Sequence, residues 1–226
     1  MTKGKRILLT VISVLVLCTA IFGILWGISG GELSDIRNIF GNHIDDTQNS
    51  KIEATAEDAA TLRELLAKDA EITIHITDDM EVEEGFIVNG TKTLTGDAVL
   101  KMSLGAELGQ ALLKITENSS LTFDGPVLDC NFNSDGIHVE TNATLTSLSG
   151  TIKYAGAYGI LTYGKVTIKD INIQDSEYIS ICAQTDSKVN IKGGSIERSA
   201  SNDVYLVNGA YVNISGNTVM EVATEH

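Results

Sequence analysis

Proline and aromatic residues are scarce in this chain. Of its 226 residues, Pro126 is the single proline and aromatic residues make up 5%, whereas 43% of the residues are apolar. A proline-rich disordered chain is therefore excluded, and the apolar fraction is too high for a chain kept unfolded by its own charge. A chain of this length usually forms one domain with an appendage. We therefore expect a packed core.

Residues suited to thiol or metal chemistry are also few. Beyond Cys18, cysteine occurs only at Cys130 and Cys182, which are too few for a disulfide scaffold. One bridge between them is an alternative, but two separate buried thiols are the simpler interpretation. The histidines show no metal-ligand spacing, and we expect them at surface or strand positions: His43, His75, His138 and His226.

Basic residues are outnumbered by acidic ones. The chain has 16 Lys and Arg against 30 Asp and Glu, and all 30 acids lie at or after Glu32. Because three bases precede Glu32, the rest of the chain has 13 bases against 30 acids, a formal charge of −17. Such a surface repels phosphate, so we expect no nucleic-acid partner.

Charge is missing altogether from residues 7–31, a run of 25 residues that follows Lys3, Lys5 and Arg6. A helix crosses the hydrocarbon core of a membrane in about 20 residues, so this run is long enough to span it. The preceding bases predict a cytoplasmic tip at residues 1–6 and an exported remainder. We expect a single-pass signal-anchor in the cell membrane, with the C-terminal domain extracellular.

Two alternatives to an uncleaved anchor remain at this stage. The first is a cleaved signal peptide, although its apolar region is normally only about 7–15 residues long. The second is a lipoprotein site at Cys18, which the bulky Leu17 before it disfavours. Residues 32–54 are polar without a sustained period and predict a linker.

A single helix is predicted directly after this linker. Thr55 has an acid three positions on, Asp58, which is typical of a helix N-terminus, and we expect the helix over residues 59–69. Its apolar residues share one face: Ala59, Leu62, Leu65 and Leu66.

The remainder of the chain alternates with a period of two and repeats one short strand. The second residues of five variants are Leu121, Leu145, Val166, Val189 and Val212, at spacings of 24, 21, 23 and 23. A second strand precedes each of them, and in several units a third follows. Three strands in a unit of about 23 residues, with Gly, Asn, Asp and Ser in the turns, predict a solenoid of stacked parallel strands. A leucine-rich repeat needs a helix in each unit, and a β-sandwich has no reason to repeat at constant spacing.

These repeats and the preceding helix resemble the right-handed parallel β-helix of the pectate-lyase-like superfamily, over residues 55–226. The segment 87–94 also resembles the opening coil of bacterial cell-surface proteins of this kind. The resemblance implies an all-β fold with an N-terminal capping helix. It implies no single activity, because such proteins include lyases, hydrolases and adhesins.

The resemblance implies a few candidate site residues. Asn133-Ser134-Asp135-Gly136 resembles the Asn-Thr-Asp-Gly element of polygalacturonase-type glycosidases, in which the aspartate is a catalytic acid, so Asp135 inherits that role. A lyase implies a base, for which Arg198 is the one arginine in the coils, and Ca²⁺ ligands, for which the candidates are Asp129, Asp170 and Asp175. The glycosidase's paired aspartates are missing, because Gly156 to Gly159 stand one coil later. Turn aspartates and one solvated arginine are the simpler interpretation.

We therefore expect a non-catalytic structural or adhesive module that needs no cofactor. Its partners are the membrane, through residues 7–31, and a glycan or a surface protein. Outward tyrosines among the six in the coils are suited to stacking on sugars. The alternative is a Ca²⁺-dependent polysaccharide lyase or, with less support, a polygalacturonase-type hydrolase. The last coil, residues 211–220, has no capping helix after it, so we expect either a longer chain or self-association there.

Overall fold

The computed structural model describes residues 52–107 and 109–220. The basic tip 1–6, the apolar segment 7–31 with Cys18, the linker up to residue 51 and residues 221–226 lie outside this part. Lys51–His226 forms one compact unit, and the buried apolar residues make one cluster within it. In the part of the chain that is described, no helix is long and apolar enough to cross a membrane.

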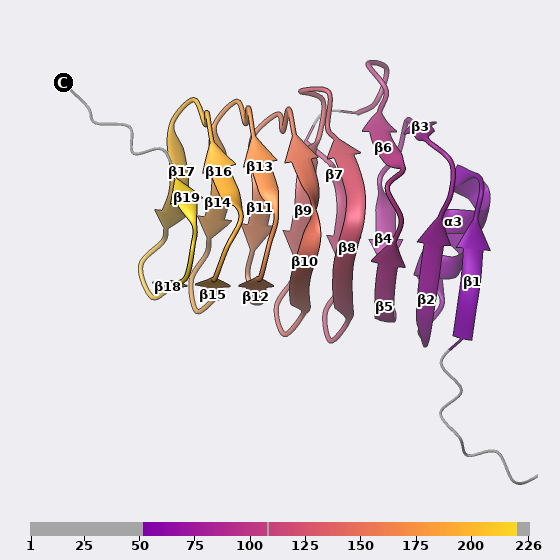
Figure 1. Cartoon of the computed structure of the whole chain (residues 1–226), viewed down its shortest axis with the longest axis horizontal. Helices are drawn as coiled ribbons and strands as arrows, with labels where there is room; N and C mark the ends of the chain where they lie inside the picture. The colour runs from indigo at the N-terminus through magenta and orange to yellow at the C-terminus, as the bar shows by residue number, and fades with distance from the viewer. Residues whose placement is uncertain (1–51, 108, 221–226) are drawn as a thin grey trace, which may run out of the picture. The chain divides into compact units, whose positions relative to one another are not determined.

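Within residues 52–107 and 109–220, nineteen strands form two parallel sheets around that cluster, and their coils follow one another in a single row (Figure 1). The 13-stranded sheet covers two sides of each coil. Its first side has the order β1 (Ile52–Ala56), β2 (Ala70–Ile76), β5 (Gly90–Thr95), β8 (Ser120–Asp129), β10 (Thr144–Lys153), β12 (Lys165–Ile168), β15 (Lys188–Ile191) and β18 (Tyr211–Ile214). Its second side adds β3 (Met80–Val82), β6 (Val99–Met102), β13 (Asn172–Gln174), β16 (Ser195–Glu197) and β19 (Val219–Met220).

The six-stranded sheet closes the third side of each coil. Its order is β4 (Phe86–Val88), β7 (Ala111–Ile115), β9 (Asp135–Val139), β11 (Tyr158–Thr162), β14 (Ile179–Ala183) and β17 (Asn202–Leu206). Neighbouring strands are therefore one coil apart in the sequence, as the repeat spacing predicts.

The register of the strands confirms the repeat residue by residue. Leu121 pairs with Leu145, which pairs with Val166, and the same ladder continues through Val189 to Val212. The ladder is apolar because it faces inward: its residues from Leu121 to Val189 are at most 1% exposed. Stacked positions lie about 4.8 Å apart, so each coil buries the inner face of its neighbour.

The ten-residue strands β8 and β10 pass from the first side of the solenoid to the second through glycines. Gly125 has φ of +111° and Gly150 has φ of +118°, in the region that residues with a Cβ avoid. A Cβ on Gly125 would lie 2.1 Å from the oxygen of Gly96, one coil earlier. The bend at Gly125 therefore needs glycine both for its backbone angle and for the close approach of the preceding coil.

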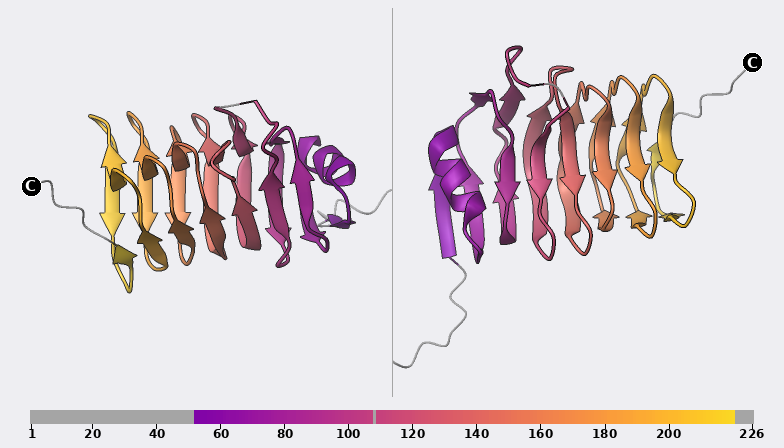
Figure 2. Two further views of the ribbon diagram at one scale, coloured as in Figure 1. Left: turned by 90° about the horizontal axis from the view of Figure 1, so that it is seen from above. Right: turned by 180° about the vertical axis from the view of Figure 1, so that it is seen from behind.

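Helix α3 (Ala59–Ala67) lies at the first end of the stack, on the third side of the first coil, where it contacts β1, β2 and β4 (Figure 2). Leu62 and Leu66 have no exposed surface, so the predicted apolar face is confirmed. The predicted N-cap was wrong. It is Asp58, whose Oδ1 accepts a 2.7 Å hydrogen bond from the Thr61 amide, whereas Thr55 belongs to β1. That strand begins at Ile52, inside the predicted linker, because its backbone pairs with β2.

Lys92 stands at an inward position of the ladder, between Ile72 and Leu121, and is 1% exposed. Its Nζ donates to the main-chain oxygens of Lys68, at 2.7 Å, and of Ala70, at 2.8 Å, and to that of Asn89. Burial lowers the pKa of Lys92, and the nearby charge of Asp69 opposes this effect. The sequence reasoning missed this residue because a lysine does not belong to an apolar repeat.

Candidate functional site

Asp135, the candidate from the Asn-Ser-Asp-Gly element, is the first residue of β9 and its side chain is 8% exposed. Its Oδ1 accepts the amides of Ala157, at 3.1 Å, and Tyr158, at 2.8 Å, in the next coil. Its Oδ2 lies 2.8 Å from Nε2 of His138. The carboxylate therefore ties two coils together and fixes the orientation of one imidazole, which sequence reasoning did not pair with it.

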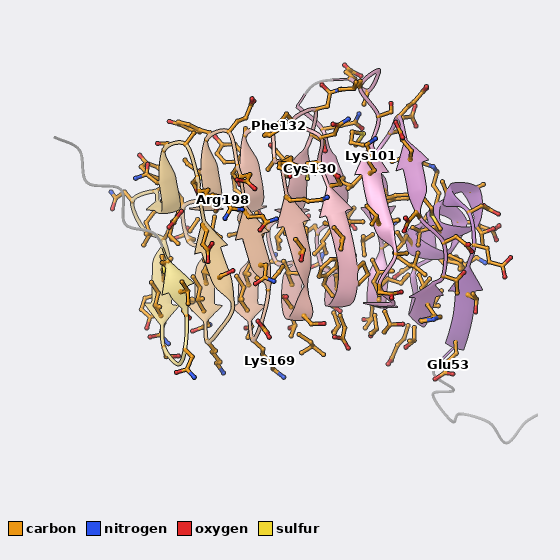
Figure 3. All side chains as sticks on the ribbon, turned by 45° about the horizontal axis from the view of Figure 1, so that its top comes forward. Glu53, Lys101, Cys130, Phe132, Lys169 and Arg198 are labelled. Atoms are coloured by element: carbon orange, nitrogen blue, oxygen red, sulfur yellow. The ribbon has the colours of Figure 1, made fainter. Side chains whose placement is uncertain are left out.

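Aromatic side chains gather beside Asp135, on the turns that lead from the second side of the solenoid to the six-stranded sheet and, at Tyr158, on the first residue of β11. Phe132 and Tyr154 lie on stacked turns with ring centroids 5.1 Å apart. Tyr158 and Tyr178 form a second pair, edge to face, at 6.2 Å. We call these four residues the aromatic corner. Phe132 is 45% exposed at the outer edge of the coils (Figure 3), and Tyr178 is 50% exposed.

Backbone hydrogen bonds hold the turns of the aromatic corner in register. The Phe132 amide donates to the oxygen of Tyr154 at 2.7 Å, and the Gly156 amide donates to that of Ser134 at 2.8 Å. Phe132 and Tyr154 both have φ of +57°, an uncommon angle for bulky residues, which the neighbouring coils maintain. The aromatic rings are thus displayed by a rigid backbone.

Tyr158 contacts both Asp135, which accepts its amide, and the ring of Tyr178. Burial raises the pKa of Tyr158, and the nearby Cys182, Asp135, Tyr178 and Tyr163 raise it further. The phenol therefore stays neutral well above neutral pH and acts as a hydrogen-bond donor.

Ion pairs flank the aromatic corner. Lys153 Nζ lies 3.0 Å from Asp129 Oδ2 and 5.2 Å from the centroid of the Tyr154 ring. Two coils further on, Arg198 holds Asp175 with two bonds, Nε to Oδ1 at 2.6 Å and Nη2 to Oδ2 at 2.9 Å. The hydrogen bonds from Arg198 lower the pKa of Asp175. Both charges of each pair thus face a partner of opposite sign.

The structure does not assemble the candidate calcium ligands. Asp129 pairs with Lys153 and Asp175 pairs with Arg198, whereas Asp170 lies exposed in the turn after β12. Across residues 52–107 and 109–220, no three His, Cys, Asp or Glu residues lie together in an arrangement that could hold a metal ion. The donor set therefore does not fit a calcium centre.

Neither thiol in the coils is suited to nucleophilic chemistry. Cys130 and Cys182 are both free and buried, which confirms the interpretation as separate thiols. Burial raises the pKa of both thiols. The reactive thiolate is therefore disfavoured at both positions.

The register, the three strands in each coil and the parallel sheets are those of a known family. The family profile described as the right-handed beta helix region matches residues 111–225. The chain belongs to the right-handed β-helix family. The match includes Asp135, His138 and the whole aromatic corner, so the candidate site lies within the β-helix region itself. Neither the curated proteins nor the solved structures that were compared with this chain gave a match.

Proposed function

We propose that this β-helix is a non-catalytic glycan-binding module on a bacterial cell surface, of the pectate-lyase-like type. The observation that carries the proposal is the aromatic corner, which presents three rings on stacked turns and that of Tyr158 at the start of β11. Aromatic faces pack against the apolar faces of sugar rings, and a phenol adds a hydrogen-bonding group at its edge. Successive coils repeat at about 4.8 Å, so an extended chain of sugars meets several rings at once.

The charge of the domain favours a neutral glycan. From Glu32 onward the chain has 13 bases and 30 acids. The two cations beside the aromatic corner, Lys153 and Arg198, are already paired with carboxylates. A polyuronate at the aromatic corner would meet a repulsive field, and both of the cations beside it already have a carboxylate partner.

The proposed module is also anchored in the membrane, through residues 7–31. The uncharged run at residues 7–31 and the bases before it favour a single-pass anchor with a cytoplasmic N-terminus. The polar residues that follow would hold the β-helix away from the lipid surface. The glycan-binding domain would then face the outside of the cell.

The second candidate is a polysaccharide-cleaving enzyme, lyase before hydrolase, and the Asp135–His138 hydrogen bond favours it. A carboxylate that orients an imidazole is a common acid–base arrangement. Hydrolysis, however, requires a second carboxylate across the scissile bond. Asp135 already accepts two amides and the imidazole, which suits a structural carboxylate.

The test uses residues 51–226, a compact unit with its own core, and a panel of neutral and uronate polysaccharides. We expect binding of a neutral glycan. The double variant Phe132→Ala/Tyr178→Ala should weaken it about tenfold, the loss of roughly 0.5–1.5 kcal/mol for each ring. Tyr211→Ala is the matched control, because Tyr211 is 56% exposed on β18 of the other sheet.

Product assays in the same samples separate the two candidates. No new reducing ends or unsaturated sugars should appear, with or without Ca²⁺. Products that vanish in His138→Ala would favour the enzyme instead. Unchanged affinity in the double variant, or the absence of binding to any glycan in the panel, would remove the support that the aromatic corner gives to the proposal.

A further inference from the structure

Four lysines on the first side of the solenoid lack the contacts that the other described lysines make. Five of the nine lysines in residues 52–107 and 109–220 bind a carboxylate or, in one case, main-chain oxygens: Lys68, Lys101, Lys114, Lys153 and Lys92. The side chains of the remaining four are exposed and form no ion pair or hydrogen bond within the described residues: Lys165, Lys169, Lys188 and Lys192. We call these four residues the lysine patch.

The lysine patch repeats the same charge in two neighbouring coils. Lys165 pairs with Lys188 in the register of β12 and β15. Lys169 and Lys192 directly follow these two strands, so they lie one coil apart as well. Like charges on opposing residues of neighbouring strands destabilise a sheet. Because the fold gains nothing from this arrangement, the geometry favours an anionic partner outside the β-helix.

Neutral side chains surround the lysine patch on its own face. Between the lysines, Thr167 pairs with Asn190. In the coils before and after, Thr144 on β10 and Tyr211 on β18 occupy the first position of the same ladder. The positive charge is therefore not cancelled along β10, β12, β15 and β18.

The acidic residues of this side lie in turns or on earlier strands. Asp170 and Asp186 are exposed in the adjoining turns, and neither forms an ion pair with the lysine patch. Further along the first side, Glu53 lies on β1, Glu71 on β2 and Asp124 on β8. The first side is thus cationic at β12 and β15, in a chain that has 30 acids against 16 bases.

We propose that the lysine patch faces an anionic lipid surface and turns the first side of the solenoid toward the membrane. This inference rests on the membrane anchor of the proposed function. Residues 32–51 span at most about 70 Å, so the anchor keeps the β-helix close to the lipid. Lysines attract anionic head groups within a Debye length, about 8 Å at physiological salt, whereas the acidic faces of the domain are repelled. The lysine patch therefore selects which face turns toward the membrane.

This orientation presents the aromatic corner to the outside. The aromatic corner joins the second and third sides, so it is the edge of the solenoid opposite the first side. Phe132 and Lys169 accordingly lie at opposite edges of the coils (Figure 3). With the lysine patch toward the lipid, the rings of Phe132 and Tyr178 point away from the membrane. A soluble polyanion would match the charges but would fix no orientation, whereas a lipid surface fits both observations.

The first experiment measures binding of residues 51–226, without the anchor, to vesicles at about 0.1 M salt. The vesicles are phosphatidylcholine alone or an equal mixture with phosphatidylglycerol, and we expect binding to the mixture to be at least tenfold stronger. Lys165→Gln/Lys188→Gln should weaken it at least tenfold, because each lysine near an anionic surface contributes about fivefold. Lys68→Gln/Lys101→Gln is the matched control, since it removes two exposed lysines outside the patch. It should leave binding almost unchanged.

Three results would overturn the proposal. The first is equal binding to both kinds of vesicle. The second is binding that Lys165→Gln/Lys188→Gln leaves intact while circular dichroism shows the variant folded. The third is binding to soluble polyphosphate without binding to the mixed vesicles, which would assign the lysine patch to a soluble polyanion.

The anchor is tested separately, by whether the full chain stays in phosphatidylcholine vesicles after an alkaline wash. A chain that washes off contradicts the anchor, and with it the reason for a lipid partner. A retained chain whose residues 51–226 do not distinguish the two kinds of vesicle contradicts only the role of the lysine patch. Glycan binding at the aromatic corner is independent of both results.

Discussion

The ammonium group of Lys92 donates a 2.7 Å hydrogen bond to the main-chain oxygen of Lys68, the C-cap residue of α3. Lys92 thereby ties the capping helix to the core ladder. We predict that Lys92→Met, which keeps the apolar stem, lowers the free energy of unfolding by about 1–3 kcal/mol because buried carbonyls lose their donor. Urea unfolding of residues 51–226 measures this. Lys165→Met, at an exposed position of β12, should change stability by less than about 0.5 kcal/mol.

The difference in unfolding free energy between the wild type and Lys92→Met should increase with pH. Burial lowers the pKa of Lys92 in the folded state below the 10.5 of the free side chain. The unfolded chain therefore binds the proton more tightly, and stability rises with pH between the lowered pKa and about 10.5. The advantage of the wild type over Lys92→Met should grow between neutral pH and pH 10. A constant difference would show that the Lys92 pKa is the same in both states.

Much of the fold could be predicted because the repeat is set by packing. Inward apolar residues alternate with outward ones along each repeated strand, and the stacked positions from Leu121 to Val212 recur every 21 to 24 residues. The sequence alone was therefore enough to predict which positions pair. Exceptions occurred where local bonding overrides the pattern. The Asp58 cap depends on one side-chain geometry, and β1 is a strand because β2 offers it an edge. Lys92 has an inward position that only its carbonyl partners explain.

The candidate site was less predictable, because its parts meet across coils. Asp135 was singled out from its motif, but two of its three contacts are amides of the next coil, and the third is His138 on its own strand. Phe132 was not singled out at all, since the fold alone brings it onto Tyr154. A check of turn positions about 22 residues apart for aromatic residues would have found this pair. Asp129, Asp170 and Asp175 look alike in the sequence, yet only the structure shows that two of them face cations.

Gly125 offers a test of the bend between the first two sides of the solenoid. We predict that Gly125→Ala lowers the free energy of unfolding by about 2–4 kcal/mol, because an unfavourable φ adds to a clash with the Gly96 oxygen. Gly109 also has positive φ, +82°, but no atom lies within 4 Å of a Cβ built there. Gly109→Ala should therefore cost only about 1 kcal/mol. Thermal unfolding of both variants separates the clash from the backbone angle, and equal losses would contradict the clash.

Asp135 and His138 should contribute unequally to stability. Asp135→Ala leaves two amides of the next coil without their acceptor, so we predict a loss of about 2–4 kcal/mol. His138→Ala removes one bond at a position that is 20% exposed, and should cost about 1 kcal/mol. Urea unfolding and glycan binding of the two variants should be compared. Under the non-catalytic proposal, His138→Ala keeps both binding and the absence of products.

The pair formed by Asp175 and Arg198 tests whether Arg198 is a structural residue. Both side chains are partly exposed, at 27% and 49%, so Arg198→Met should cost no more than about 1 kcal/mol at neutral pH. The hydrogen bonds from Arg198 lower the pKa of Asp175 below its usual 3.8. The pair therefore stabilises the fold above pH 3.8, and this contribution is lost as the pH falls through the lowered value. The gap between wild type and Arg198→Met should thus close in acid, whereas Lys192→Met, at an exposed position, should show no such trend. If Arg198 were the base of a lyase, Arg198→Met would abolish product formation. Under the non-catalytic proposal, Arg198→Met removes only this small, pH-dependent contribution to the free energy of unfolding.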